Sequence, residues 1–211
     1  MSACWVKICG ITNLEDALAA IQAGADAVGL NFVPTSPRAL SRKAAWGILQ
    51  ALPDTVMTVG VVANENPDFL KGLLRVCPLK AFQFHGDEPP QEVLALKGQA
   101  RLIKAIRVKG AESLKQIPLY QGVNAVLLDT HQPGKPGGTG RPFDWRLALE
   151  AKSFRIPVIV AGGLNPSNVA SVIRQVRPYG VDVSSGVEVS PGRKDPTLIR
   201  EFILKAKQAA A

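Results

Sequence analysis

The sequence predicts an α/β protein folded as a single closed (β/α)8 barrel, the TIM-barrel architecture, over residues 1–211. Eight short apolar runs alternate with segments of helical spacing, and neither a linker nor a change in composition divides the chain. The strand–helix units average about 26 residues each, which is short but workable for a parallel barrel. The predicted strands are residues 5–9, 27–32, 57–62, 81–84, 102–108, 125–128, 157–160 and 181–183.

These runs are nearly continuous in apolar residues, as expected of parallel strands that are buried on both faces. A doubly wound open sheet is the competing fold, but it would show fewer strands and a glycine-rich turn after the first one. The first turn here is Gly10-Ile11-Thr12, and neither G-x-G-x-x-G nor G-x-x-x-x-G-K-[ST] occurs in the chain. The pattern therefore favours the barrel.

Helix-start signals follow the predicted strands. Asn13 precedes apolar residues at helical spacing, with Glu15 and Asp16 in the first turn and Gly24 at the end. The segment 111–117, after the fifth strand, has the weakest helical pattern. The other predicted starts are Ser41, Asn66-Pro67, Pro89, Asp144, Asn165-Pro166 and Asp195-Pro196.

The composition argues against several classes of protein. Three cysteines with no paired spacing disfavour a disulfide framework and fit a reducing cytoplasm. The N-terminus shows no basic region followed by an apolar stretch, and glycine and proline interrupt the longest uncharged run, residues 156–173, so we expect no signal peptide and no membrane span. The net charge is +8, but the basic residues are scattered along the chain and no cluster of aromatic residues accompanies them. This pattern disfavours binding of nucleic acid and suits attraction of small anions to a cleft.

The C-terminal ends of the strands, where barrel enzymes carry their chemistry, hold several polar residues and glycines. The groups after strands seven and eight are predicted to bind a phosphate through backbone N–H groups, although glycines that only close tight turns are the alternative. The residues at the strand ends are Cys9, Asn31, Asn64, His85, Arg107, Asp129, the pair Gly162 and Gly163, and the triplet Ser184, Ser185 and Gly186.

Cys9 and Asp129 are the candidate base and acid, and we expect them to face each other across the barrel mouth. Alternation puts Lys7 on the face of Cys9, and a nearby cation lowers a thiol pKa and raises the thiolate fraction. Asp129 ends an apolar run, where loss of water raises a carboxyl pKa and suits a general acid. A buried unreactive thiol and a loop-capping carboxylate are the alternatives. Closure of the barrel also predicts that Lys7 pairs with Asp182.

Three further features bear on a binding site. Arg38, in the loop after strand two, suits a carboxylate by bidentate pairing, although an exposed surface arginine is the alternative. His85 is expected either to line the pocket or to be a hydrogen-bonded structural histidine. The glycine-rich residues 137–140 suggest a mobile cover. Without a cluster of histidines or carboxylates at ligand spacing, no metal site is predicted.

Motifs along essentially the whole chain resemble those of the phosphoribosylanthranilate isomerases, barrel enzymes of tryptophan biosynthesis. Small departures are Val62, Ala63 and Phe84, apolar exchanges that are expected to affect the shape of the pocket wall and to leave the implied chemistry untouched. The matching motifs are Lys7-Ile8-Cys9-Gly10-Ile11-Thr12, Ser36-Pro37-Arg38, residues 83–88, Leu128-Asp129-Thr130, residues 137–140, Phe143-Asp144-Trp145, residues 161–169, residues 181–188 and residues 191–195.

The resemblance implies an Amadori rearrangement of N-(5'-phosphoribosyl)anthranilate to 1-(2-carboxyphenylamino)-1-deoxyribulose 5-phosphate, with no metal or organic cofactor. It makes Cys9 the general base and Asp129 the general acid. It also implies that Arg38 pairs with the anthranilate carboxylate and that the backbone near Gly163 and Gly186 holds the phosphate. The expected substrate-binding residues are Lys7, Arg38, His85, Gly138 and Asp182.

Two other functions compete with this one. A sugar-phosphate isomerase of histidine biosynthesis shares the barrel and the reaction type, but that family uses an aspartate at the end of strand one, where Cys9 stands here. A catalytically silent barrel that binds sugar phosphates would keep the glycine loops but could lose Cys9 or Asp129, and both are present. The sequence does not decide between a monomer and a homodimer.

Overall fold

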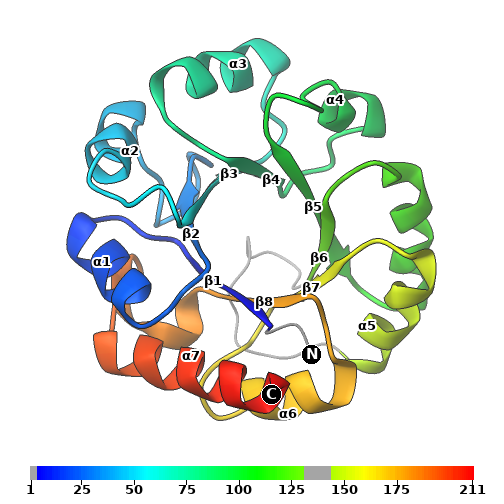
Figure 1. Cartoon of the computed structure of the whole chain (residues 1–211). Helices are drawn as coiled ribbons and strands as arrows, with labels where there is room; N and C mark the ends of the chain where they lie inside the picture. Colours follow the sequence, from blue (N-terminus) through cyan, green and yellow to red (C-terminus); the bar gives the residue numbers. More distant parts are fainter. Residues whose placement is uncertain (1–3, 131–143) are drawn as a thin grey trace.

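Eight parallel strands form a closed barrel in the computed structural model, which describes residues 4–130 and 144–211 (Figure 1). The strands follow one another around the barrel in chain order, and the first pairs with the last. The prediction of a (β/α)8 barrel is therefore confirmed. The strands are β1 (Trp5–Cys9), β2 (Ala27–Asn31), β3 (Met57–Val62), β4 (Ala81–Phe84), β5 (Arg101–Val108), β6 (Ala125–Thr130), β7 (Val158–Val160) and β8 (Gly180–Val183).

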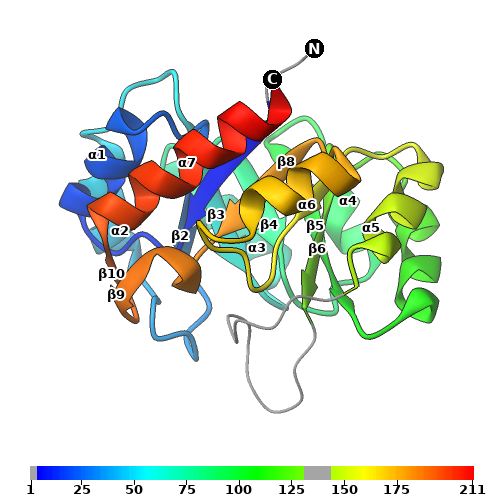
Figure 2. The same cartoon turned by 90° about the horizontal axis from the view of Figure 1, so that it is seen from below.

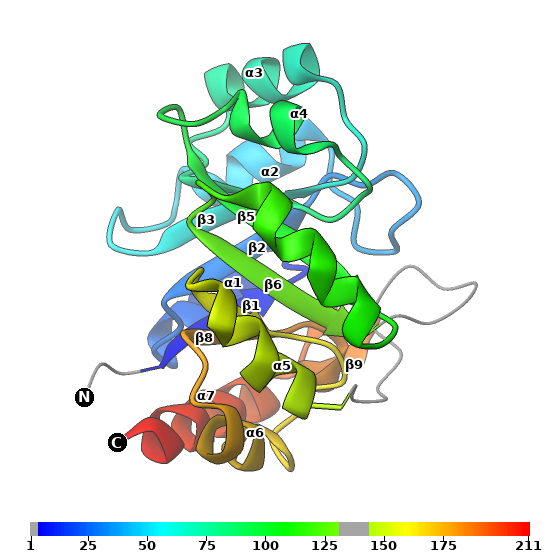
Figure 3. The same cartoon turned by 90° about the vertical axis from the view of Figure 1, so that its right-hand side faces the viewer.

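Helices surround the barrel and cover the outer faces of its strands (Figure 1). The α-helices are α1 (Leu14–Gln22), α2 (Arg42–Leu49), α3 (Pro67–Val76), α4 (Pro90–Leu94), α5 (Arg146–Ala151), α6 (Val169–Val176) and α7 (Pro196–Ala210). The 3-10 helices are η1 (Ala111–Tyr120), η2 (Lys152–Phe154) and η3 (Ser185–Val187). Helices α5, α6 and α7 lie side by side on one side of the barrel, and α7 also packs on α1, which links the two ends of the chain (Figure 3).

Helix caps agree with the start signals of the sequence at four helices, where a side-chain oxygen accepts a backbone N–H group in the first turn. These caps are Asn13, Ser41, Asn66 and Asp195. Helix α6 starts at Val169 and not directly after Pro166. The reason is a turn in which Asn165 accepts the Ser167 N–H at 2.8 Å and Asn168 accepts the Asn165 N–H at 2.9 Å.

The segment after β5 is the 3-10 helix η1, in line with its weak α-helical pattern. Pro118 lies inside it and lacks an N–H group for the α-helical hydrogen bond, which favours the tighter turn. The segment after β4 forms only a short helix, because α4 ends at Leu94.

The barrel has two apolar layers that follow the alternation of each strand. Val6 and Ile8 of β1 point outward into the large core between strands and helices. The inward layer is rich in alanine, which fits the narrow interior, and it includes Ala27, Val59, Ala81, Ile103, Ala105, Ala125, Leu127, Ile159 and Ala161. Polar inward residues stand nearer the C-terminal ends of the strands.

A short antiparallel hairpin after β8 has no counterpart in the sequence prediction. It consists of β9 (Glu188–Ser190) and β10 (Arg193–Lys194). In Figure 2 it lies below the barrel, at the end opposite to the C-terminus of α7. The described part of the chain contains no helix that is long and apolar enough to cross a membrane.

Candidate active site

A cavity of about 460 Å³ opens at the C-terminal ends of the barrel strands. Its volume lies within the range of small-molecule sites. Strands from around the whole barrel contribute to its wall, so side chains that are far apart in the sequence meet here. The wall includes Cys9, Asn31, Val61, Gln83, Arg107, Asp129 and Asp182.

Cys9 ends β1 on this wall and is 8% exposed. The sulfur lies over Gly29 of the neighbouring strand, where an added Cβ would come within 2.8 Å of it. Burial raises the pKa of the Cys9 thiol; Lys7 lowers it, Asp182 raises it and Lys194 lowers it, and the pKa stays above its ordinary value. Lys7 therefore lowers the pKa of the thiol, as predicted, but desolvation outweighs this effect and the net shift is upward.

Lys7 pairs with Asp182 at 2.7 Å, as closure of the barrel predicted. Its ammonium also donates to the Gln83 side-chain oxygen at 2.8 Å. Burial alone would lower the pKa of Lys7, but Asp182 and Cys9 beside it leave the pKa raised, so the buried lysine stays charged. Lys7 has no exposed area. It lies one layer below the end of its strand and not on the cavity wall, and its role in binding substrate stays a prediction.

The Lys7→Met variant should alkylate at Cys9 only at higher pH than the wild type. Removing the cation removes one influence that lowers the thiol pKa, so the thiolate forms later as pH rises. The rate of alkylation against pH, followed by mass spectrometry of the Cys9 peptide, measures this shift. Lys43→Met, at an exposed lysine of α2, is the matched control. An unchanged profile would mean that Lys7 serves only as a structural partner of Asp182.

Asp129 and His85 form a second pair on the cavity wall. Asp129 Oδ1 accepts the Thr130 N–H at 2.7 Å, so the carboxyl does cap its loop. Its Oδ2 lies 3.2 Å from His85 Nε2. His85 both lines the cavity and is hydrogen-bonded, so the two interpretations of this residue hold together. Gly162 is required beside them, because a Cβ there would lie 2.7 Å from Asp129 Oδ1.

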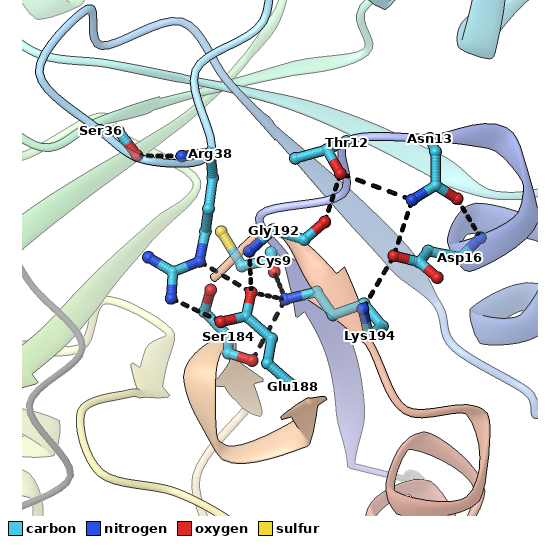
Figure 4. Close-up of polar contacts among 10 residues, drawn as sticks. All are labelled: Cys9, Thr12, Asn13, Asp16, Ser36, Arg38, Ser184, Glu188, Gly192 and Lys194. Carbon is cyan, nitrogen blue, oxygen red and sulfur yellow. Dashed lines mark hydrogen bonds and ion pairs between the residues drawn. The ribbon is translucent and has the colours of Figure 1, made fainter. Parts of the chain in front are cut away.

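Arg38 lines the cavity, but Glu188 of β9 already occupies one edge of its guanidinium. Nε and Nη2 donate to the two carboxylate oxygens at 2.8 and 2.6 Å (Figure 4). A protein carboxylate therefore occupies the edge formed by Nε and Nη2, whereas the edge formed by Nη1 and Nη2 takes no part in this ion pair. The pairing of Arg38 with a substrate carboxylate stays a prediction. Burial would raise the pKa of Glu188, but the bonds from Arg38 and the charge of Lys194 leave it lowered.

Lys194 of β10 anchors the hairpin under the site, as Figure 4 shows. Its buried ammonium donates to Glu188 at 2.8 Å, to the Cys9 carbonyl at 2.6 Å and to the Ser184 carbonyl at 3.1 Å. The hairpin therefore ties the ends of β1 and β8 together and holds Arg38 in place. Glu188 and Lys194 had no role predicted from the sequence, although both lie within the motifs of residues 181–188 and 191–195.

Gly162 and Gly163 follow β7, and Ser184 and Ser185 follow β8, and all four line the cavity. The two glycines have φ values of +76° and +70°, which side-chain-bearing residues rarely adopt. Gly186 is not on the cavity wall. It packs against the loop after β7, where a Cβ would lie 2.9 Å from the Leu164 carbonyl carbon.

The remaining expectations concern Gly138 and a metal. Gly138 and the glycine-rich residues 137–140 lie outside the described residues. Within residues 4–130 and 144–211, no group of three or more histidine, cysteine or carboxylate side chains is placed to hold a metal ion.

Comparison with known proteins decides the family. The family model for N-(5'-phosphoribosyl)anthranilate (PRA) isomerase matches residues 6–205. The chain belongs to this isomerase family. The resemblance seen in the sequence is thereby confirmed, and several of its motifs contribute residues to the cavity wall, among them Cys9, Arg38, Asp129 and Ser184.

Relatives of the family match nearly the whole chain. N-(5'-phosphoribosyl)anthranilate isomerase from Geobacter sulfurreducens is 50% identical over 202 residues, which are 96% of this chain and 98% of that protein. The crystal structure of phosphoribosyl anthranilate isomerase from Thermotoga maritima has a TM-score of 0.92 and 43% identity, covering 97% of this chain and 99% of the other. A phosphoribosyl anthranilate isomerase in complex with reduced 1-(o-carboxyphenylamino)-1-deoxyribulose 5-phosphate has a TM-score of 0.88 and 41% identity, with the same coverage.

Gln83 belongs to one of the family motifs, but the sequence predicted no role for it. It stands two residues before His85, and alternation along β4 puts both on the inward face. The period of two along β4 therefore indicated that Gln83 faces inward, but only the folded barrel shows its contact with Lys7 of β1.

Proposed function

We propose that the protein catalyses the Amadori rearrangement of N-(5'-phosphoribosyl)anthranilate to 1-(2-carboxyphenylamino)-1-deoxyribulose 5-phosphate, with Cys9 as general base and Asp129 as general acid. The observation that carries the proposal is the presence of both side chains on the wall of one cavity in a member of the N-(5'-phosphoribosyl)anthranilate isomerase family. Cys9 ends β1 and Asp129 lies in β6, with β7 and β8 between them, so the two groups approach a bound molecule from different sides.

The proposed chemistry moves one proton in and one proton out. Asp129 gives a proton to the furanose ring oxygen as the bond from that oxygen to C1′ breaks, and a Schiff base with a cationic nitrogen forms. Cys9, as thiolate, takes the proton from C2′, which the cation has made acidic, and the electron pair of that bond neutralises the nitrogen. The resulting enolamine tautomerises to the ketone. The raised pKa of Cys9 makes the free thiolate a minor species, but a strong base once formed.

The two anionic ends of the substrate match two parts of the cavity wall. Gly162, Gly163, Ser184 and Ser185 surround the mouth after β7 and β8, where backbone N–H groups suit a phosphate. Arg38 stands on the side of β2, held by Glu188, and suits the anthranilate carboxylate through its other edge. A guanidinium held in position by a buried partner loses little freedom when it binds, which favours orientation of the substrate.

Turnover of the substrate by the purified protein tests the proposal. N-(5'-phosphoribosyl)anthranilate is mixed with enzyme, and the anthranilate fluorescence is followed with time. We expect a continuous fall in fluorescence at a rate proportional to enzyme concentration. A fluorescence change that is complete on mixing, is proportional to the amount of protein and does not continue would show that the protein binds the substrate without this activity.

The Arg38→Ala variant should weaken ligands that carry the anthranilate carboxylate by about 1.5–3 kcal/mol, the range for a charge-assisted hydrogen bond, and spare a plain pentose phosphate. Calorimetric titration with the reaction product and with the pentose phosphate measures both affinities. Arg174→Ala on the exposed side of α6 is the control for the lost charge. Equal weakening of both ligands would place Arg38 at the phosphate end or in the general field of the site.

A further inference from the structure

A chain of polar contacts crosses the interior of the barrel and ends at Asp129. Asp182 accepts from Lys7 at 2.7 Å, and Lys7 donates to Gln83 Oε1 at 2.8 Å. Gln83 Nε2 lies 2.8 Å from His85 Nδ1, and His85 Nε2 lies 3.2 Å from Asp129 Oδ2. The contacts join β8, β1, β4 and β6, and Lys7 and Gln83 are buried, with 0% and 1% exposure.

The direction of each hydrogen bond from Lys7 to Asp129 follows from the Lys7 ammonium. An ammonium can only donate, so the atom of Gln83 that meets Lys7 must be the carbonyl oxygen. The amide nitrogen then faces His85, and because this nitrogen also only donates, Nδ1 must accept and carry no proton. A neutral imidazole with a bare Nδ1 has its proton on Nε2, which donates to Asp129. The buried cation therefore sets the same tautomer whether Asp129 is ionised, and can only accept, or protonated, and could also donate.

We propose that Gln83 is a positioning residue that keeps His85 neutral with its proton on Nε2, so that a further proton entering the His85–Asp129 pair has only the Asp129 carboxyl to occupy. This inference rests on the proposed role of Asp129 as general acid. An imidazolium beside Asp129 would stabilise the carboxylate and remove the proton that the ring oxygen needs. A neutral Nε2–H group orients the carboxyl without that cost.

The other charged groups around the site leave this assignment intact. Cys9, Arg38, Asp87, Arg107 and Asp182 share the cavity wall with the pair. Arg107 and Asp87 bind each other at 2.6 Å on the rim, Arg38 binds Glu188, and Asp182 binds Lys7. Asp129 is thus the charged group that contacts His85 among the described residues. Lys7 keeps its charge, because its pKa is raised by Asp182 and Cys9 against the effect of burial.

Nitrogen NMR of histidine-labelled protein tests the inference directly. The chain has two histidines, His85 and His131, so the spectrum is simple and a His131→Asn sample assigns it. In the neutral state we expect His85 Nδ1 to give the signal of an unprotonated ring nitrogen and Nε2 that of a protonated one. Signals for a protonated Nδ1 and a bare Nε2 in the wild type would overturn the proposal. This measurement needs no turnover, so it is independent of the proposed reaction.

The Gln83→Glu variant reverses the bond at Nδ1, because a carboxylate accepts where the amide donated. We expect Nδ1 to gain a proton, and kcat to fall by about tenfold or more with little change in KM, since an imidazolium beside Asp129 favours the carboxylate and leaves less of the acid that the reaction needs. Gln175→Glu, an exposed glutamine of α6, controls for the added charge and should match the wild type. Nδ1 remaining bare in Gln83→Glu would refute the role of Gln83.

Two further measurements separate the role of Gln83 from effects on Cys9 and from the influence of Asp129. The new carboxylate also contacts Lys7, so the Cys9 alkylation profile is measured on the same variant and shows any part of the loss that comes from the base. In Gln83→Met the amide donor is lost without added charge, and His85 should show both neutral tautomers. A single Nε2–H tautomer in Gln83→Met would assign the proton position to Asp129 alone.

Discussion

Cys9→Ala should lower turnover by at least about 10²-fold, the lower range for loss of a positioned proton-transfer group, and leave product binding within about twofold of the wild type. The thiol is the basic atom proposed to reach C2′, and alanine keeps the strand and removes that atom. The cavity wall is otherwise built from neighbouring strands, so the residues proposed to hold the phosphate and the carboxylate stay in place. Steady-state fluorescence assays give kcat, and calorimetry with the product gives the affinity.

A buried cysteine outside the site provides the matched control for Cys9. Cys77 follows α3, is 1% exposed and lies 3.7 Å from the Arg42 carbonyl oxygen. Cys77→Ala therefore loses a buried thiol and some stability but should keep kcat. Comparison of the two variants separates the loss of a reacting group from the effect of a small cavity in the core. Full activity of Cys9→Ala would remove the thiolate from the mechanism.

Asp129→Asn should produce a loss of similar size, at least about 10²-fold in kcat, because the amide has no acidic proton for the ring oxygen. Asparagine keeps the size of the side chain, and its oxygen can still accept the Thr130 N–H bond seen at 2.7 Å. Product affinity should again change little. The same kinetic and calorimetric measurements apply.

The exposed Asp68 of α3 serves as the control for Asp129, and Asp68→Asn should keep wild-type turnover. A second comparison comes from the substrate itself. If ring opening is the step that needs Asp129, Asp129→Asn should isomerise the substrate slowly. It should also release free anthranilate from the substrate no faster than the wild type does. Wild-type turnover in Asp129→Asn would transfer the acid role to another group on the cavity wall.

Local sequence features predicted the strands, most helix starts and the faces of β1. Asn13, Ser41 and Asn66 cap helices because a short side-chain oxygen can meet a free N–H group within the same turn. The period of two in β1 put Lys7 and Cys9 on the inward face, and the closure rule of a barrel brought Asp182 to Lys7. Each of these features depends on neighbours along the chain or on one topological rule.

The pairing of Arg38 with Glu188 could not be predicted in the same way. The two residues are 150 positions apart, and their contact depends on a hairpin that folds back over the end of β1. Arginine in a rim loop suits a carboxylate of either a ligand or the protein. Only the folded loop after β8 shows that a protein carboxylate takes one edge and leaves the other.

The sequence by itself determined the barrel, the family and the residues that stand at the ends of the strands, because strand periodicity, helix caps and motif spacing are properties of the chain. The tertiary structure alone decided the state of those residues. Burial outweighs the cation at Cys9 and raises its pKa, and Lys7 acts across the barrel through Gln83 to direct the proton on His85. Desolvation and the direction of hydrogen bonds depend on what surrounds a side chain in space, and spacing along the chain does not contain that information.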